Sequence, residues 1–203
     1  MALLPRILAS GLFGAEMEDA GQPVPLHPLE ERLVATSSDK RRRDFALGRA
    51  CAHSALAALG HDDAVVGMGE RGAPLWPGGV LGSITHTRGY AAALVAEARN
   101  FSGVGLDAER VGDVTENLWP RLFDAAERNY LLALDAASRP VQATLFFSAK
   151  EACYKAWMVR GALRFHDIHV TPEEGGFTAT RADENLHGRY ALQGDLMLTA
   201  AWF

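Results

Sequence analysis

Hydrophobic and polar positions follow two different periods along the first half of this chain. Apolar residues recur at helical spacing over residues 38–59, which follow capping candidates at 36–39 and end at Gly60. Residues 80–87 and 90–96 then read as strands, and Arg88-Gly89 between them suits a hairpin turn. The pattern predicts one helix followed by antiparallel strands.

The second half shows the same order of elements. Residues 117–134 are predicted to be helical, and a further helix is expected to open at Ser148. Residues 166–203 alternate in strand fashion, with Gly175-Gly176 as a hairpin turn and an apolar final strand at 196–203. A second set of helix and strands therefore follows the first.

Two such sets predict an α/β (α+β) fold with halves 1–100 and 101–203 that join near residues 97–103. A chain of 203 residues with 48% hydrophobic content can bury a full core, and its net charge of -5 argues against general nucleic-acid binding. No uncharged apolar stretch is long enough for a membrane span, and no signal peptide is expected. Cys51 and Cys153 suit core positions in a reducing cytoplasm, where we expect the protein to reside.

A third predicted strand, residues 103–109, separates apolar from acidic positions. With a period of two, one face carries Val104, Leu106 and Ala108, and the other carries Gly103, Gly105, Asp107 and Glu109. Glycine weakens a strand unless something must approach its backbone closely, and carboxylates at i and i+2 can ligate one ion. The second face therefore suits a metal site; the alternative is a polar face that meets solvent before a turn.

The segment that begins at Ser148 carries a second charged cluster. Glu151 and Lys155 lie at i and i+4 and share a helix face, with Lys150 beside them. Two alternatives need no ligand: Ser148-x-x-Glu151 is a capping-box pattern, and Glu151 with Lys155 can form a surface salt bridge. Together with the strand carboxylates, however, these charges in apolar sequence favour a divalent cation with a polyphosphate ligand.

Basic residues upstream could bind the same polyphosphate. Arg49 lies within the apolar stripe of helix 38–59 and Arg41 lies at its edge, where a guanidinium must find an anion or reach solvent. Arg71 lies in a Gly- and Pro-rich loop, and His86 ends the first strand. The alternatives are a solvated basic face for the arginines and a structural, hydrogen-bonded role for the histidine.

Three segments together resemble, in order and spacing, the motifs of the surfactin-type 4′-phosphopantetheinyl transferases: Gly82-Ser83-Ile84-Thr85-His86-Thr87, Val104-Gly105-Leu106-Asp107-Ala108-Glu109 and Phe147-Ser148-Ala149-Lys150-Glu151-Ala152-Cys153-Tyr154-Lys155-Ala156. Two others look more like the enterobactin synthetase component D subgroup: Arg41-x-x-x-Phe45-x-x-x-Arg49 and Gly72-Ala73-Pro74-Leu75-Trp76-Pro77. The resemblance covers residues 38–165. Phe147-Ser148 stands where Trp-Thr is common in the surfactin type, and Thr85 where Ser is common, which bears on the subgroup and not on the chemistry.

The resemblance implies a monomer of two similar α/β halves related by a pseudo-twofold axis, with the active site in the cleft between them. Residues 1–100 would grip the nucleotide and phosphates of coenzyme A, and residues 101–203 would carry the acidic residues and the catalytic helix. The implied reaction is the Mg²⁺-dependent transfer of the 4′-phosphopantetheine arm of coenzyme A to a serine of an apo acyl or peptidyl carrier protein. Adenosine 3′,5′-bisphosphate would be released.

The resemblance also implies roles for single residues. Asp107, Glu109 and Glu151 would hold Mg²⁺, with Glu109 the least certain because some members ligate through water there. Glu151 would also serve as the base for the carrier serine, and Glu127 matches a glutamate that assists as a base in some members. The phosphates of coenzyme A would be bound and neutralised by basic residues: Lys155, Lys150, His86, Arg41, Arg49 and Arg71.

Two other functions compete with the transferase. An Asp-x-Glu strand followed by a helix with Glu and Lys also suits a metal-dependent phosphodiesterase or nuclease. The net negative charge and the absence of a basic stripe weigh against it. A coenzyme A or carrier-protein binding module without activity is the second competitor, and the intact Asp107, Glu151 and Lys155 argue against it.

Overall fold

The computed structural model describes residues 2–158 and 165–203, apart from the side chain of Arg71. Two antiparallel sheets form its frame, one ordered β1-β5-β4 and the other β6-β10-β9-β8-β7, and β2 pairs with β3 in a separate ribbon. The strands are β1 (Phe13–Glu18), β2 (Gly67–Met68), β3 (Pro74–Leu75), β4 (Val80–Thr87), β5 (Tyr90–Glu97), β6 (Val104–Arg110), β7 (His169–Glu173), β8 (Gly176–Arg181), β9 (Glu184–Gln193) and β10 (Leu196–Trp202).

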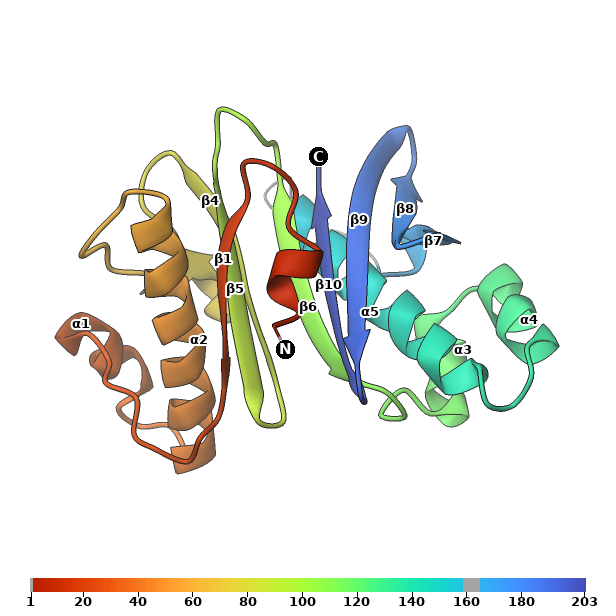
Figure 1. The fold of residues 1–203 in the computed structure, drawn as a ribbon, viewed down its shortest axis with the longest axis horizontal. Helices are drawn as coiled ribbons and strands as arrows, with labels where there is room; N and C mark the ends of the chain where they lie inside the picture. Colours follow the sequence, from red (N-terminus) through yellow and green to blue (C-terminus); the bar gives the residue numbers. More distant parts are fainter. Residues whose placement is uncertain (1, 159–164) are drawn as a thin grey trace.

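The helices lie on the outside of this frame, with α1 and α2 beside one sheet and α3, α4 and α5 beside the other (Figure 1). They are α1 (Pro28–Glu31), α2 (Asp39–Ala58), α3 (Trp119–Leu122), α4 (Ala125–Ala133) and α5 (Arg139–Trp157), with short 3-10 turns η1 (Leu4–Arg6), η2 (Arg32–Val34), η3 (Glu70–Gly72), η4 (Glu116–Leu118) and η6 (Phe165–Asp167). The prediction of an α/β fold with two halves, each a long helix on an antiparallel sheet, is confirmed. Within the described residues no helix is long and apolar enough to cross a bilayer.

Local signals placed α2 and the neighbouring strands correctly. Ser38 is the N-cap of α2, and its hydroxyl accepts the backbone N–H of Arg41 at 3.3 Å. The predicted strands before and after Arg88-Gly89 are present as β4 and β5, and the chain crosses to β6 after Glu97. The predicted strand segment at 166–203 is present as β7 to β10, with the Gly175-Gly176 turn between β7 and β8 and the final apolar strand as β10.

Two helix predictions were wrong. α5 begins at Arg139, so Ser148 lies in the middle of that helix and Ser148-x-x-Glu151 is not a capping box. Pro140 is tolerated there because a proline in the first turn has no N–H bond to lose. The single helix expected at residues 117–134 is broken at Phe123, which is extended, and Asp124 and Glu127 form the capping box of α4 instead.

Strand β1 was not predicted. It pairs antiparallel with β5, which places β5 in the centre of its sheet and explains why nearly all of β5 is buried. Phe13, Ala15 and Met17 alternate with more polar residues along β1, and this period of two was the available signal.

The two halves share a central core. α2 covers the outer face of one sheet and α5 covers the outer face of the other, and the inner faces pack against each other. Leu94 of β5, Leu106 of β6 and Leu198 of β10 meet there, and Leu4 and Ile7 near the N-terminus complete the cluster. Each of these side chains contributes about 1.5–3 kcal/mol by burial, so the halves stabilise one another.

Helix α5 lies unusually close to β6. A Cβ added at Gly105 would lie 1.9 Å from the carbonyl oxygen of Ala152, and one at Gly103 would lie 2.4 Å from that of Ala156. The two glycines were predicted to clear space for a ligand, and this interpretation is corrected: the backbone that approaches them belongs to α5. Their absence of side chains sets the distance between the strand that carries Asp107 and the helix that carries Lys155.

Substitution Gly105→Ala is expected to destabilise the fold by about 3 kcal/mol or more, because the added methyl meets helix backbone that cannot turn aside. Chemical denaturation followed by circular dichroism measures the change. Gly78→Ala is the matched control, since nothing lies within 4 Å of its added Cβ. Equal stability of the two variants would contradict the packing argument.

Candidate functional site

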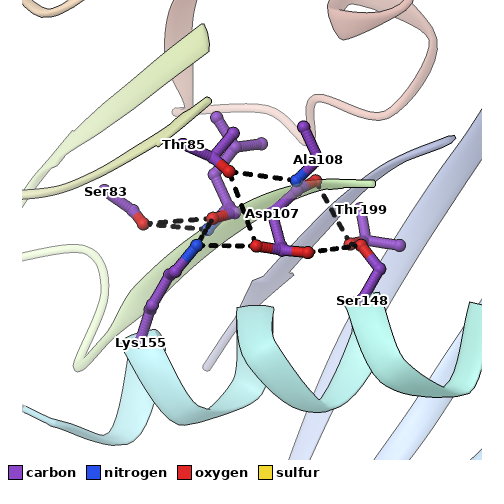
Figure 2. A network of polar contacts seen from close by, with 8 residues as sticks. Ser83, Thr85, Asp107, Ala108, Ser148, Lys155 and Thr199 are labelled. Atoms are coloured by element: carbon purple, nitrogen blue, oxygen red, sulfur yellow. Dashed lines mark hydrogen bonds and ion pairs between the residues drawn. The ribbon is translucent and has the colours of Figure 1, made fainter. Parts of the chain in front are cut away.

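Asp107 lies at the centre of the candidate site, on β6 facing α5, and is only 4% exposed. Lys155 Nζ donates to its Oδ1 at 2.7 Å, and Ser148 Oγ donates to its Oδ2 at 2.8 Å (Figure 2). Lys155 also donates to the carbonyl oxygen of Leu106 at 2.9 Å. Both oxygens of the carboxylate are therefore held by donors from α5.

Ser83 and Thr85 connect the two halves beside Asp107. β4 and β6 are edge strands of different sheets, and side-chain hydroxyls replace the backbone ladder between them. The backbone N–H of Leu106 donates to Ser83 Oγ at 3.0 Å, and that of Ala108 donates to Thr85 Oγ1 at 3.0 Å (Figure 2). Sequence reasoning missed this role, although hydroxyl residues spaced by two on a partly apolar strand were a usable signal.

Glu109 and Glu151 lie close enough to Asp107 for their pKa values to respond to it. The pKa of Glu109 is raised to about 8, chiefly by burial and next by the negative charge of Asp107. The pKa of Glu151 is also raised by burial and by Asp107, whereas Lys155 opposes that shift. The charge of Asp107 therefore disfavours ionisation of both glutamates, as expected where a cation could be bound.

The donor set fits Mg²⁺. Carboxylate oxygens are the protein ligands that Mg²⁺ prefers, and Asp107, Glu109 and Glu151 supply them without thiolate or imidazole. Within the part of the chain that the structure describes, however, no three acidic, histidine or cysteine side chains already converge as a ligand set. Asp107 forms an ion pair with Lys155 instead, so an ammonium group lies against one oxygen of the carboxylate.

A cavity of about 400 Å³ opens beside this cluster, between the two halves. The first half lines it with Trp76 and Ser83, and the second half with Glu151, Tyr154 and Lys155. Its walls are mostly apolar apart from these charges. The predicted cleft between the halves is thus present, with the charged face of α5 on one side.

Arg41 on α2 and His86 near the end of β4 lie outside the lining of this cavity. Arg41 is exposed, its Nη2 lies 3.8 Å from the position that a Cβ of Gly72 would take, and it makes no ion pair with the described side chains. His86 is also exposed, but the surrounding protein lowers its pKa by desolvation, and the positive charges of Arg41 and Lys155 lower it further. Asp44 opposes this lowering of the His86 pKa, and Lys155 is already paired with Asp107, so Arg41 is the cation here that could still pair with an anion.

Arg49 is placed differently. It is only 4% exposed, its Nη2 donates to the carbonyl oxygen of Gly67 at 2.9 Å, and its guanidinium lies 4.4 Å from the centre of the Phe45 ring. The fully buried Glu30 lies 3.9 Å from its Nε, and desolvation lowers the arginine pKa. Arg49 thus takes part in a structural network, and its predicted coenzyme contact stays a prediction. The side chain of Arg71 lies outside the described residues.

Lys150 and Glu127 lie apart from the cluster around Asp107. Lys150 Nζ donates to Glu127 Oε2 at 2.7 Å, and both side chains are buried. The expectation that Lys150 lies beside Glu151 on the helix is corrected: along α5, Ser148, Glu151 and Lys155 share one face, while Lys150 points about 200° away from Ser148. The phosphate-binding role predicted for Lys150 and the role as base for Glu127 are not tested by this arrangement.

Comparison with known proteins identifies the family to which these residues belong. The 4′-phosphopantetheinyl transferase N-terminal domain family matches residues 29–96, and the 4′-phosphopantetheinyl transferase superfamily matches residues 103–201. The chain is 40% identical to 4′-phosphopantetheinyl transferase Npt of Nocardia iowensis, over 95% of this chain and 86% of that protein.

Two further relatives agree. The chain is 33% identical to 4′-phosphopantetheinyl transferase PptT of Mycobacterium tuberculosis, over 98% of this chain and 95% of that protein. It is 32% identical to enterobactin synthase component D of Salmonella typhi, over 85% of this chain and 76% of that protein. With relatives this similar along most of its length, the chain belongs to the 4′-phosphopantetheinyl transferase superfamily.

Proposed function

We propose that this chain transfers the 4′-phosphopantetheine arm of coenzyme A to a serine of an apo acyl or peptidyl carrier protein, with Mg²⁺, and releases adenosine 3′,5′-bisphosphate. The observation that carries this proposal is the cleft between the halves. Glu151 and Lys155 line it on one side, with Asp107 and Glu109 next to them. The names of the relatives support transfer of the same group.

The halves divide the binding of coenzyme A. Residues 1–100 supply the exposed Arg41 and His86, which bind phosphates at the nucleotide end through charge-assisted hydrogen bonds. Residues 101–203 supply the carboxylates and α5, which hold the pyrophosphate. We expect the protein to act as a monomer in the cytoplasm.

Asp107, Glu109 and Glu151 would hold Mg²⁺, which when bound neutralises charge on the pyrophosphate oxygens. In the transfer, Glu151 accepts the proton of the carrier serine, directly or through water, as the serine oxygen bonds to the phosphorus of the arm. The bond from that phosphorus to the bridging pyrophosphate oxygen breaks. Lys155 neutralises the charge that develops on the leaving group.

Two observations favour transfer over the competing functions. The cavity beside Glu151 and Lys155 is mostly apolar, which suits a coenzyme with a nucleotide base and a pantetheine arm better than the backbone of a nucleic acid. Asp107, Glu151 and Lys155, the charged residues that the transfer requires, are all present, which disfavours an inactive binding module. The identity of the carrier protein is open among fatty-acid, polyketide, nonribosomal peptide and siderophore pathways.

Incubation with coenzyme A, Mg²⁺ and a panel of apo carrier proteins, followed by intact mass spectrometry, tests the proposal. At least one carrier is expected to gain one phosphopantetheine mass, and chelation of Mg²⁺ with EDTA should abolish the gain. Hydrolysis of bis-p-nitrophenyl phosphate without any carrier modification would favour the phosphodiesterase instead.

Asp107→Asn and Glu151→Gln are each expected to reduce the rate of arm transfer by about 10³-fold, because a metal ligand contributes several kcal/mol of charge stabilisation. Initial rates of carrier modification measure the loss, and circular dichroism checks the fold. Glu116→Gln is the control, since that carboxylate is 63% exposed and pairs with Arg139 at 3.7 Å, away from the cluster around Asp107. Near-normal turnover in either variant would refute the assignment.

Arg41→Ala is expected to raise the KM for coenzyme A about tenfold with little change in kcat, because a charge-assisted hydrogen bond to phosphate contributes about 1.5–3 kcal/mol. The neighbouring Arg42→Ala should leave the KM unchanged, since Arg42 faces Glu31 at 3.7 Å. An unaltered KM in the Arg41 variant would remove this residue from the coenzyme site.

Lys150→Met is expected to reduce the free energy of unfolding by about 3–5 kcal/mol, because it leaves the Glu127 carboxylate buried without its cation. Adding Glu127→Leu should restore part of the stability, as measured by urea denaturation. If Lys150 bound phosphate instead, the variant would keep wild-type stability and show a raised KM for coenzyme A.

A further inference from the structure

Ser148 makes a different hydrogen bond from the other buried hydroxyl residue of α5. Thr144 bonds to the carbonyl oxygen of Pro140 at 2.8 Å, four residues earlier, which is the usual partner for a hydroxyl inside a helix. Ser148 Oγ is turned outward and donates to Asp107 Oδ2 at 2.8 Å on the neighbouring strand. Both side chains are completely buried, so the different choice of partner reflects where Ser148 sits and not solvent access.

A second buried hydroxyl, that of Thr199, contacts Ser148 beside its hydrogen bond to Asp107. Thr199 lies directly opposite Asp107 in the pairing of β10 with β6, it is completely buried, and its Oγ1 is within hydrogen-bond distance of Ser148 Oγ (Figure 2). A serine hydroxyl has one proton to donate. Because Ser148 gives that proton to Asp107, only Thr199 can donate across the contact between the two hydroxyls, and its hydroxyl also lies 3.4 Å from the backbone carbonyl oxygen of Asp107, a second acceptor for its proton.

The Ser148 hydroxyl holds one carboxylate oxygen of Asp107, and Lys155 and Thr85 lie against the other. Oδ2 of Asp107 is turned to Ser148, while Oδ1 faces Lys155 at 2.7 Å and the Thr85 hydroxyl at 3.5 Å (Figure 2). An aspartate side chain without such a partner could rotate about its terminal torsion, which is broad. Together with Lys155, the hydroxyl pair thus limits the Asp107 carboxylate to one orientation.

We propose that Ser148, backed by Thr199, is a positioning residue that orients Asp107 for binding the divalent cation. The inference rests on the proposed function, in which Asp107 is a metal ligand. Groups that orient a metal ligand through a hydrogen bond typically change metal affinity by one to two orders of magnitude when removed. Neither hydroxyl touches the reacting groups themselves.

Mn²⁺ binding to the full chain in the presence of coenzyme A, followed by the electron paramagnetic resonance signal of the free ion, tests this role. Ser148→Ala should weaken Mn²⁺ binding about tenfold. Ser148→Thr, which keeps the hydroxyl, should retain the wild-type affinity, and Thr199→Val should weaken it by a smaller factor. Thr144→Val is the matched control: it removes a buried hydroxyl from the same helix and should leave the Mn²⁺ affinity unchanged.

Asp107→Asn distinguishes a failure of the metal-ligand role of Asp107 from a failure of the positioning role of Ser148. If this variant binds Mn²⁺ as the wild type does, Asp107 is not a ligand and the metal role in the proposed function fails. If it loses Mn²⁺ while Ser148→Ala binds normally, only the positioning role is overturned. Thermal unfolding of each variant checks folding. If Ser148→Ala does not fold, Thr199→Val serves as the test, and an unchanged Mn²⁺ affinity in that variant overturns the inference.

Discussion

The close packing of α5 on β6 is the constraint on which the site depends. At Gly105 any side chain would meet the backbone of α5, because the position of its Cβ lies 1.9 Å from the carbonyl oxygen of Ala152. The same helix carries Ser148 and Lys155, whose bonds to Asp107 are 2.8 and 2.7 Å long. These hydrogen bonds would break if α5 moved away from β6 to accommodate a larger side chain. The glycine therefore serves the chemistry through packing and not through direct contact with a ligand.

Buried charge is matched on both sides of this helix. An isolated carboxylate in the interior would cost several kcal/mol, and Asp107 avoids this through its bonds to Lys155 and Ser148. On the other side Lys150 and Glu127 neutralise each other, 2.7 Å apart. The two lysines, five residues apart in sequence, thus have separate roles, which their common motif does not reveal.

Local signals predicted much of the fold, and contacts between distant segments explain what they missed. The cap at Ser38 and the alternation in β4 and β5 depend on neighbours in sequence, so they could be read directly. The Ser148-x-x-Glu151 pattern could not, because the same residues suit a helix start and a helix middle, and only the position of Asp107 on another element distinguishes them. The sequence motifs identified the acidic cluster of Asp107, Glu109 and Glu151. The pairing of Lys150 with Glu127 joins residues on different helices, so it could be recognised only from the structure.

The proposed function requires a cation at Asp107, Glu109 and Glu151, even though Lys155 already pairs with Asp107. One ammonium group offsets one carboxylate, and burial, with a smaller contribution from the charge of Asp107, still raises the pKa values of Glu109 and Glu151. At neutral pH a carboxyl with a pKa of about 8 keeps its proton most of the time. A divalent cation reverses this balance, because it stabilises the ionised form of each ligand that it touches. At the proposed site, metal and proton would therefore compete for the glutamate oxygens, while Ser148 holds Oδ2 of Asp107 and Lys155 meets Oδ1.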